Sequence, residues 1–488
     1  MSWTTQPRKL ADFGKLLPAE KKLLAELDTG QPCIIGREVP PENPPEDIVI
    51  RASFLRWCIL RGPEEETPKT RMHEKGLRVQ GAFIQGDGPT PYNAEHTTGL
   101  DLQGCTIRGD LILAFCRFPD MVLLRGASLT TLNLHGSHLM AGLAADGMQT
   151  TGAVFLRQVQ VTGETRLLGA RIGGDLACDG GRFENPVNDE KGQPNDALAI
   201  NRAEVLGGFF WREGTRIEGA MDLRAAKLGV INDDPDCWPK KEGELLLDRC
   251  TYDAFLGRSP VDARQRLKWL ALQDPTRWGA DFWPQPYEQL AKVLRETGHE
   301  ADARRVMIEK ERLQRAAARR RAYKSNPNFG GVVRFLLFVR DWLLGTTVRY
   351  GRQPFLAFAW LLGFWLLGLI VFQTAQNQGA LKPNNAFVLR APEWVGCAGT
   401  QAYPTQYDCF RAQPQAVSYP RFNAAIYSLD TLLPIVALEM QEFWIPDEDH
   451  PFGYWARIYL WVQIGLGWAL SLLAVAGFSG LIRSDSGT

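Results

Sequence analysis

Apolar residues recur about every eleven positions from residue 100 to residue 230, which is the most regular pattern in the chain. In several units a glycine precedes a short apolar strand, as in Ile107-Arg-Gly-Asp-Leu-Ile-Leu and Ile172-Gly-Gly-Asp-Leu-Ala-Cys. A short fixed period with turn glycines is typical of a β-solenoid, in which each coil buries its inward side chains against the next coil. We predict coils of about 22 residues over 100–258. The alternative, an antiparallel β domain, does not explain so long a periodic pattern.

Two long stretches near the C-terminus lack charge. No charged residue occurs between Arg352 and Lys382, and 25 uncharged residues separate Arg457 from Arg483. Each stretch is long enough for a helix that crosses about 30 Å of hydrocarbon. Two buried helices of a soluble domain are the alternative, but a soluble helix seldom lacks charge on its outer face over this length. We therefore predict transmembrane helices at 354–373 and 456–483.

Basic residues and cysteines predict the orientation of these spans. Arginines cluster just before the first span and Arg483 follows the second, whereas 374–455 also carries several acidic side chains. The positive-inside rule predicts a multi-pass protein of the cell inner (plasma) membrane, with both termini cytoplasmic and 374–455 outside. The polar first residues show no signal peptide, which agrees with this orientation. Cys397 and Cys409, the only cysteines of the external segment, could form a disulfide on an oxidising side.

The composition narrows the function classes. The chain has 488 residues with 55 basic and 55 acidic side chains, so no net charge attracts it to nucleic acid. Its 45% apolar content excludes disorder as the main state. Nine cysteines spread over this length do not form a disulfide scaffold. We expect a folded multidomain protein that binds no nucleic acid.

A helical connector is predicted at 259–331, after the solenoid. Pro286 starts one helix, Gly298 ends it, and a strongly basic helix follows from Ala301 to Ala322. An amphipathic segment at 332–353 follows, with the spacing of a helix that lies flat on the inner leaflet. A solvated basic face is the alternative to attraction by anionic lipid headgroups. The candidate headgroup-binding residues are Arg319, Arg320, Arg321, Arg334 and Arg340.

The apolar stretch 422–438 lies between the two spans and is too short to cross the bilayer, so we predict a re-entrant helix. Asp430, Thr431 and Glu439 are candidate pore residues, because carboxylates from several copies form charged rings that favour cations. The alternative is that these carboxylates are simply exposed on an external surface. A homo-oligomer is expected, because a re-entrant segment cannot leave its backbone unpaired in lipid.

Two parts of the chain resemble known families. Ala127-Ser128-Leu129 and Ala170-Arg171-Ile172 look like the Ala-x-Leu unit of pentapeptide-repeat proteins, and that resemblance implies a right-handed parallel β-helix. The short segment Tyr427-Ser428-Leu429-Asp430-Thr431-Leu432, set between two spans, resembles the pore helix of two-transmembrane pore-loop channels of the potassium-channel class. The stretch that follows, 432–438, has no glycine and differs from a potassium filter, so the resemblance does not extend to potassium selectivity.

The layout as a whole resembles a bacterial family labelled membrane-associated oxidoreductases, including the Tyr287-x-x-Leu290-Ala291 helix. That label implies an oxidoreductase, which we keep as the alternative function. The sequence contains no Walker A, G-x-G-x-x-G or H-E-x-x-H motif, and no residue set that would hold NAD, flavin, haem or an iron–sulfur cluster. We therefore expect no catalytic residue, no cofactor and no metal.

These expectations combine into one architecture. A cytosolic region and solenoid cap at 1–99 leads into the solenoid, the helical hairpin, the interfacial helix and the two-helix transmembrane domain with its pore-loop-like segment. The function expected is a membrane-anchored sensing or scaffolding platform with an oligomeric ion-channel-like pore. Its partners would be the lipid membrane, further copies of the chain and a protein on the solenoid.

Overall fold

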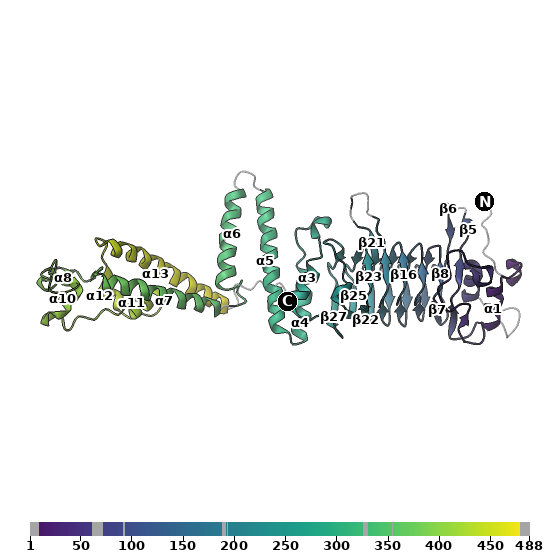
Figure 1. Ribbon diagram of the computed structural model, residues 1–488, viewed down its shortest axis with the longest axis horizontal. Coiled ribbons are helices and arrows are strands. Elements are labelled where there is room, and N and C mark those ends of the chain that lie inside the picture. Colours follow the sequence, from purple (N-terminus) through teal and green to yellow (C-terminus); the bar gives the residue numbers. More distant parts are fainter. Residues whose placement is uncertain are drawn as a thin grey trace. The chain divides into compact units, whose positions relative to one another are not determined.

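A computed structural model describes residues 9–60, 72–90, 93–187, 192, 194–325, 330–353 and 355–478. The chain forms two compact units, Met1–Lys310 and Glu311–Thr488, and the boundary falls within helix α5 (Glu300–Ser325). The first unit contains long parallel sheets, and the second contains helices (Figure 1).

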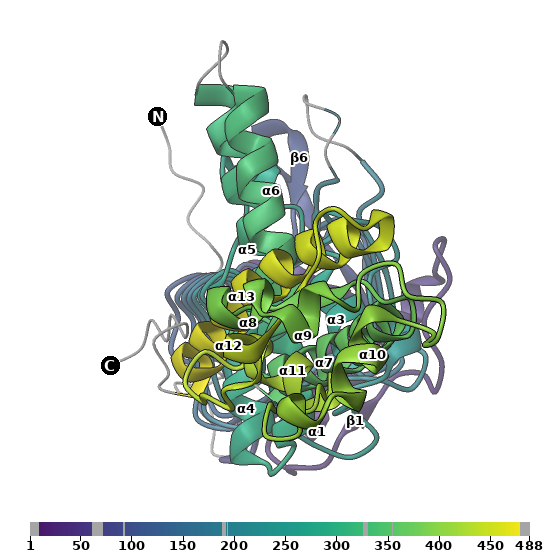
Figure 2. The same cartoon turned by 90° about the vertical axis from the view of Figure 1, so that its left-hand side faces the viewer.

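Parallel strands stack along the first unit as a solenoid. Val154 pairs with Leu176 on one face and Val161 with Phe183 on the next, so paired residues are 22 positions apart. This spacing agrees with the coil length predicted from the eleven-residue period. In Figure 2, which looks along the stack, the corners of successive coils lie behind one another. Each coil therefore buries its inward side chains against its neighbours.

Four rows of short strands, joined into three parallel sheets, form the faces of this stack. The largest contains β1 (Cys33–Ile34), β3 (Gly76–Gln80), β7 (Asp110–Ala114), β10 (Ser128–Leu129), β11 (Leu132–Asn133), β14 (Gln149–Thr150), β15 (Val154–Phe155), β18 (Arg171–Ile172), β19 (Leu176–Ala177), β22 (Glu204–Trp211), β25 (Lys227–Asp233) and β27 (Thr251–Phe255). The second contains β2 (Val49–Arg51), β4 (Phe83–Gln85), β8 (Arg117–Phe118), β12 (His138–Leu139), β16 (Gln160–Thr162), β20 (Arg182–Glu184) and β23 (Arg216–Glu218). The third contains β9 (Val122–Leu123), β13 (Leu143–Ala144), β17 (Thr165–Arg166), β21 (Asp196–Ala199), β24 (Ala220–Asp222) and β26 (Leu245–Leu246).

Inward rows of aliphatic side chains hold the coils together. Leu111, Leu132, Val154 and Leu176 follow one another along one face and are fully buried. Burial of such a side chain contributes about 1.5–3 kcal/mol, and the row repeats this gain in every coil. Gly142 shows why glycine is required at some corners. Its φ is +89°, and an added Cβ would lie 2.5 Å from a backbone oxygen of the next coil.

The stack begins earlier than the boundary at residue 100 that the period indicated. β3 pairs in parallel with β7, and β2 pairs with β4, so the segment 1–99 supplies coils as well as a cap. An antiparallel hairpin of β5 (Asp87–Thr90) and β6 (Asn93–Thr98) interrupts the period there, which hides these coils from a search for repeats.

Short helices close the N-terminal end of the stack. They are η1 (Leu10–Phe13), α1 (Pro18–Glu26), η2 (Glu46–Ile48) and α2 (Ala52–Leu60). Glu20 is completely buried, and both of its carboxylate oxygens accept hydrogen bonds from the Arg51 guanidinium, at 2.8 and 2.6 Å. Because a buried carboxylate needs such a partner, this pair ties α1 to the first coils.

Helices follow the last coil. α3 (Ala263–Leu270), η5 (Pro275–Trp278) and α4 (Gln285–Glu296) lead to α5, whereas the short η4 (Pro235–Cys237) lies earlier, between β25 and β26. α4 and α5 occupy the positions predicted for the helical hairpin, and Gly298, with φ of +86°, separates them. α3 is an additional helix that the pattern did not reveal.

The second unit contains the amphipathic helix α6 (Gly330–Thr347) and two long apolar helices, α7 (Phe355–Asn377) and α13 (Pro451–Phe478). α7 and α13 are long and apolar enough to cross a membrane, and only 22% and 28% of their most apolar windows are buried. This differs from the core helices of a soluble domain, which are mostly buried. Residue 354, residues 479–483 of the second predicted span and the residues 326–329 of the connector lie outside the described part of the chain.

Short elements fill the segment between α7 and α13. They are β28 (Leu381–Pro383), α8 (Ala386–Arg390), α9 (Pro392–Val395), α10 (Gln406–Ala412), η6 (Pro414–Ala416), α11 (Ala424–Leu432), α12 (Met440–Phe443) and β29 (Trp444–Pro446). β28 and β29 pair in an antiparallel manner. A core of aromatic rings, including Trp394, Tyr407, Phe410 and Trp444, holds this segment together.

Candidate functional site

Helix α11 lies against both long helices and is the centre of the first candidate site (Figure 1). Asn423 starts the helix, because its side-chain oxygen accepts hydrogen bonds from the N–H groups of Ala425 and Ile426, at 3.0 and 3.1 Å. The helix ends at Leu432, after which the backbone is extended. The re-entrant helix predicted at 422–438 thus corresponds to a nine-residue helix followed by a non-helical segment that turns at 434–435.

Contacts place α11 at the middle of the long helices. The Ser428 hydroxyl donates a 2.9 Å hydrogen bond to the carbonyl of Trp365 in α7. The Gln463 side chain of α13 donates a 2.8 Å bond to the carbonyl of Ser428. Leu432, the last residue of α11, packs with Leu361 of α7 and Leu470 of α13. The middle of α11 therefore lies beside the central turns of both helices, and its C-terminal end lies toward the N-terminal part of α7.

Two glycines allow this close packing. A Cβ at Gly368 of α7 would meet the Ser428 hydroxyl and the Gln463 amide, and one at Gly467 of α13 would meet the carbonyl of Leu432. Gly465, two residues away on α13, has nothing within 4 Å of its hypothetical Cβ. Glycines at these contacts let backbones approach closely, as is common between membrane helices.

Asp430 is not an exposed carboxylate in the single chain. It is 4% exposed, and its oxygens accept hydrogen bonds from the backbone N–H groups of Leu438 (2.7 Å) and Gln441 (2.9 Å). Asp430 therefore fixes the backbone of the segment 438–441, which follows α11, by hydrogen bonds. The hydroxyl of Thr431 donates to the carbonyl of Tyr427 within α11, at 2.9 Å. Only Glu439 of the three pore candidates is exposed, and it has a positive φ of 62°.

The segment 433–439 after α11 is exposed along most of its length. Ile435 is 84% exposed, and Val436 and Leu438 are also exposed. Within the described part of the chain, the backbone N–H groups of Ile435 and Ala437 have no hydrogen-bond partner. Apolar side chains and unpaired backbone groups thus occur together directly after α11. The sequence indicated the helix but gave no sign of which backbone groups remain unpaired.

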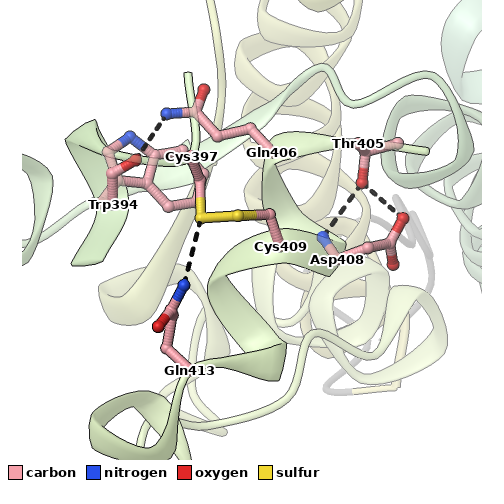
Figure 3. Close-up of a disulfide and its surroundings, with 7 residues drawn as sticks. All are labelled: Trp394, Cys397, Thr405, Gln406, Asp408, Cys409 and Gln413. Atoms are coloured by element: carbon pink, nitrogen blue, oxygen red, sulfur yellow. Dashed lines mark hydrogen bonds between the residues drawn. A yellow bond between two sulfur atoms is a disulfide. The ribbon is translucent and has the colours of Figure 1, made fainter. Parts of the chain in front are cut away.

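A disulfide joins Cys397 and Cys409 in the segment between the long helices, with Cα atoms 5.7 Å apart (Figure 3). The Gln406 amide beside it donates a 3.0 Å hydrogen bond to the carbonyl of Trp394, and Thr405 caps α10 by accepting from the N–H of Asp408. The two predicted disulfide residues are therefore brought together. The bond links α10 to the turn after α9 and stabilises the aromatic core around it.

The second candidate site lies between α5 and α6. Arg315 and Arg319 of α5 and Arg340 of α6 all contact the carboxylate of Asp341, which is 4% exposed; the Arg315 and Arg340 contacts measure 3.4 and 3.0 Å. Burial opposes ionisation of Asp341, but the hydrogen bonds from Arg340 and Arg319 outweigh it and lower the pKa of Asp341 below its usual value. The carboxylate therefore stays charged near neutral pH.

The five predicted headgroup residues occupy three different positions in the structure. Arg319 and Arg340 belong to the cluster around Asp341, whereas Arg320 and Arg321 are exposed on α5. Arg334 lies over the ring of Tyr323, 5.6 Å from its centre. Arg315 and Asp341 were missed by sequence reasoning. The only available signal was that Asp341 is the sole acidic residue between Glu311 and Glu393.

The solenoid offers a third candidate, a cavity of about 570 Å³ on its side. Basic Arg216, Lys240 and Lys241 face it together with acidic Glu218 and Asp236. No set of three or more His, Cys, Asp or Glu side chains suited to a metal occurs within the described residues. The mixed charges do not select one ligand class.

The buried thiols of the solenoid are packing residues in the described coils. Burial raises the pKa values of Cys116 and Cys250 to about 12. A thiol with so high a pKa is almost never a thiolate at neutral pH, and the thiolate is the reactive form.

Comparison with known proteins identifies no relative. Neither a family model, nor a curated protein, nor a solved structure matches this chain.

Proposed function

We propose that this protein is a membrane-anchored scaffolding or sensing platform, in which α7 and α13 cross the bilayer and carry the solenoid. The observation that carries the proposal is the exposure of apolar side chains all along both helices. Ile370 of α7 is 63% exposed, and Trp461 and Leu472 of α13 are 57% and 63% exposed. Such surfaces would be costly in water, whereas the hydrocarbon interior of a bilayer would cover them.

The solenoid is the platform in this proposal. We take it to be a right-handed parallel β-helix on the cytoplasmic side, with a protein partner on its outer faces and both termini in the cytoplasm. The disulfide supports this orientation, because disulfides persist on the oxidising side of a bacterial membrane and not in the cytosol. The seven other cysteines lie in the first unit and are free thiols.

Membrane fractionation followed by site-specific labelling tests the anchor and its orientation. Ser418→Cys and Arg304→Cys would be made separately in a Cys105→Ser background, because Cys105 is only partly buried and could itself be labelled. A maleimide that cannot cross membranes should label position 418, but not position 304, in intact spheroplasts. Detergent should make position 304 reactive. Recovery of the protein in the soluble fraction, or labelling of position 304 alone in spheroplasts, would contradict the proposal.

Self-association is the second part of the proposal. Unpaired backbone N–H groups at Ile435 and Ala437 cannot face hydrocarbon without a cost of several kcal/mol each. Further copies of the chain, or a water-filled cavity between copies, would remove that cost. The mass of the particle in nanodiscs would measure this directly. Four or five copies support a shared central cavity, and a monomer contradicts it.

A pore is the function that such a cavity would allow, and α11 with its returning segment is the observation that favours it. Glu439 is exposed and would supply a ring of carboxylates, whereas Asp430 is engaged with the backbone. Conductance in planar bilayers should therefore lose cation preference with Glu439→Gln. Glu393→Gln, which removes a partly buried carboxylate from α9, is the control for loss of charge elsewhere in the same segment. Absence of current from oligomeric, folded protein would rule out the pore while leaving the anchor intact.

A further inference from the structure

The hairpin of α5 and α6 has far more positive than negative charge. Residues 312–353 include ten arginines and lysines, and their only carboxylate is Asp341. In the structure this carboxylate is buried, and guanidinium groups from both helices converge on it. The Asp341 carboxylate therefore brings several arginines together, but its single negative charge cannot balance their positive charges.

The charge balance at the contact itself is also positive. Arg315, Arg319 and Arg340 contact Asp341, and Arg315 also contacts Glu311 at 3.5 Å. Among the contacts of Asp341 and Arg315 given above, three guanidinium groups thus face two carboxylates. The Nε atom of Arg315 is buried and has no hydrogen-bond partner among the described residues. A buried N–H without an acceptor is costly, so Arg315 is short of one hydrogen-bond acceptor.

The surface beside this cluster is apolar. On α6, Phe335, Leu336 and Trp342 are 63%, 60% and 56% exposed, and Trp342 follows Asp341 directly in the chain. An amphipathic helix of this kind places its apolar side chains at the level of the acyl chains and its charges at the level of the headgroups. The anion that can reach the exposed parts of these three guanidinium groups from such a surface is a lipid headgroup.

We propose that Arg315, Arg319 and Arg340 bind the phosphomonoester headgroup of an anionic lipid, with Asp341 as the residue that positions them. This inference rests on the membrane anchor proposed above. Arginine forks pair with phosphate oxygens in a bidentate manner. A phosphomonoester presents three terminal oxygens and up to two negative charges, whereas a phosphodiester headgroup presents two oxygens and one charge. Three convergent guanidinium groups therefore favour the monoester.

Lipid retention in nanodiscs tests this preference with the protein already inserted. Discs of phosphatidylcholine would contain either 10% phosphatidic acid, a monoester, or 10% phosphatidylglycerol, a diester. Lipids that remain bound after extraction into detergent would be counted by native mass spectrometry. We expect phosphatidic acid to be retained about tenfold over phosphatidylglycerol. Equal retention of the two lipids by the unaltered protein would overturn the proposal.

Matched variants locate the site. Arg315→Gln with Arg319→Gln should reduce retention of phosphatidic acid to the level of phosphatidylglycerol. Arg304→Gln with Arg305→Gln removes the same charge from another part of α5 and should leave retention unchanged. Equal loss in both pairs would show attraction by net charge alone and contradict a site.

Two further measurements separate the remaining causes of failure. Arg315→Lys with Arg319→Lys keeps the positive charge but removes the guanidinium forks. Intermediate retention of phosphatidic acid by this folded variant would show that bidentate pairing contributes to binding. Full retention would contradict a role for bidentate pairing. Glycerol 3-phosphate added to phosphatidylcholine discs tests a soluble source of the same headgroup. Its binding with the affinity of the lipid would overturn the lipid assignment. Failure of the protein to enter any disc would instead count against the membrane anchor.

Discussion

The guanidinium group of Arg266 donates two hydrogen bonds of 2.8 Å to the carboxylate of Asp233. Arg266 belongs to α3 and is completely buried, and Asp233 ends β25 in one of the last coils. The indole of Trp238 donates a further 2.7 Å bond to Asp233, and the ring of Phe255 lies 3.6 Å from the guanidinium carbon. The pair therefore connects the end of the stack to the first helix after it.

Loss of this pair should strongly destabilise the first unit. Arg266→Met leaves the Asp233 carboxylate buried without its main partner, which typically costs about 3–5 kcal/mol in the free energy of unfolding. Pulse proteolysis of the full chain in urea would measure the loss through fragments of the solenoid. Arg264→Met, an exposed change on the same helix, is the control and should have little effect. Equal stability of the two variants would show that the pair contributes nothing.

Reduction of the Cys397–Cys409 disulfide should loosen the segment between α7 and α13. The bond closes a loop with a sequence separation of 12, and such loops typically contribute about 2–4 kcal/mol. Limited proteolysis with and without dithiothreitol would show new cleavage between α9 and α10 only after reduction. The Cys397→Ser variant should already be cleaved without the reductant and should not respond to it. Equal resistance of reduced and oxidised protein would contradict the prediction.

An added methyl group at Gly467 should displace α11 from the long helices. A Cβ there overlaps the carbonyl of Leu432, and such overpacking typically costs about 1–3 kcal/mol. Gly465→Ala is the matched control, since its Cβ meets nothing within 4 Å. Thermal unfolding in detergent should show a lower midpoint for Gly467→Ala alone. Equal midpoints would mean that α11 does not pack as closely as described.

Acid should open the hairpin of α5 and α6. The pKa of Asp341 is lowered in the folded state from its usual 3.8, so the ionised carboxylate contributes stability above that value. This contribution is lost as the pH falls below about 4, through the lowered pKa, because the protonated acid no longer pairs with Arg319 and Arg340. Spin labels on α5 and α6 should therefore move apart between pH 5 and pH 2. Asp341→Asn should already show the longer distance at pH 7, and a distance independent of pH in the unaltered protein would contradict this account.

Features with a local cause could be predicted from the sequence. The eleven-residue period predicted stacked coils of 22 residues, because a coil buries the same positions each time it repeats. The helices α4, α5, α7 and α13 follow from proline, glycine and uncharged runs that act within a few turns. The earliest coils could not be found in this way, because the β5–β6 hairpin interrupts their spacing.

The candidate sites needed the tertiary structure. Asp430 looked like a pore carboxylate in the sequence, yet its oxygens hold the N–H groups of Leu438 and Gln441. Nothing in the spacing of Arg315 and Asp341 showed that they would meet, because they belong to different helices. Contacts of this kind depend on how two elements pack, and neither element contains that information alone.

The order of residues by itself determined where apolar surface must be buried and where charge is excluded, since hydrophobic periodicity acts on each element separately. Only the packing of distant segments decided which polar groups form pairs and which remain without a partner. Burial removes water from those groups, so their partners are set by whichever side chains arrive at the same place in the folded chain.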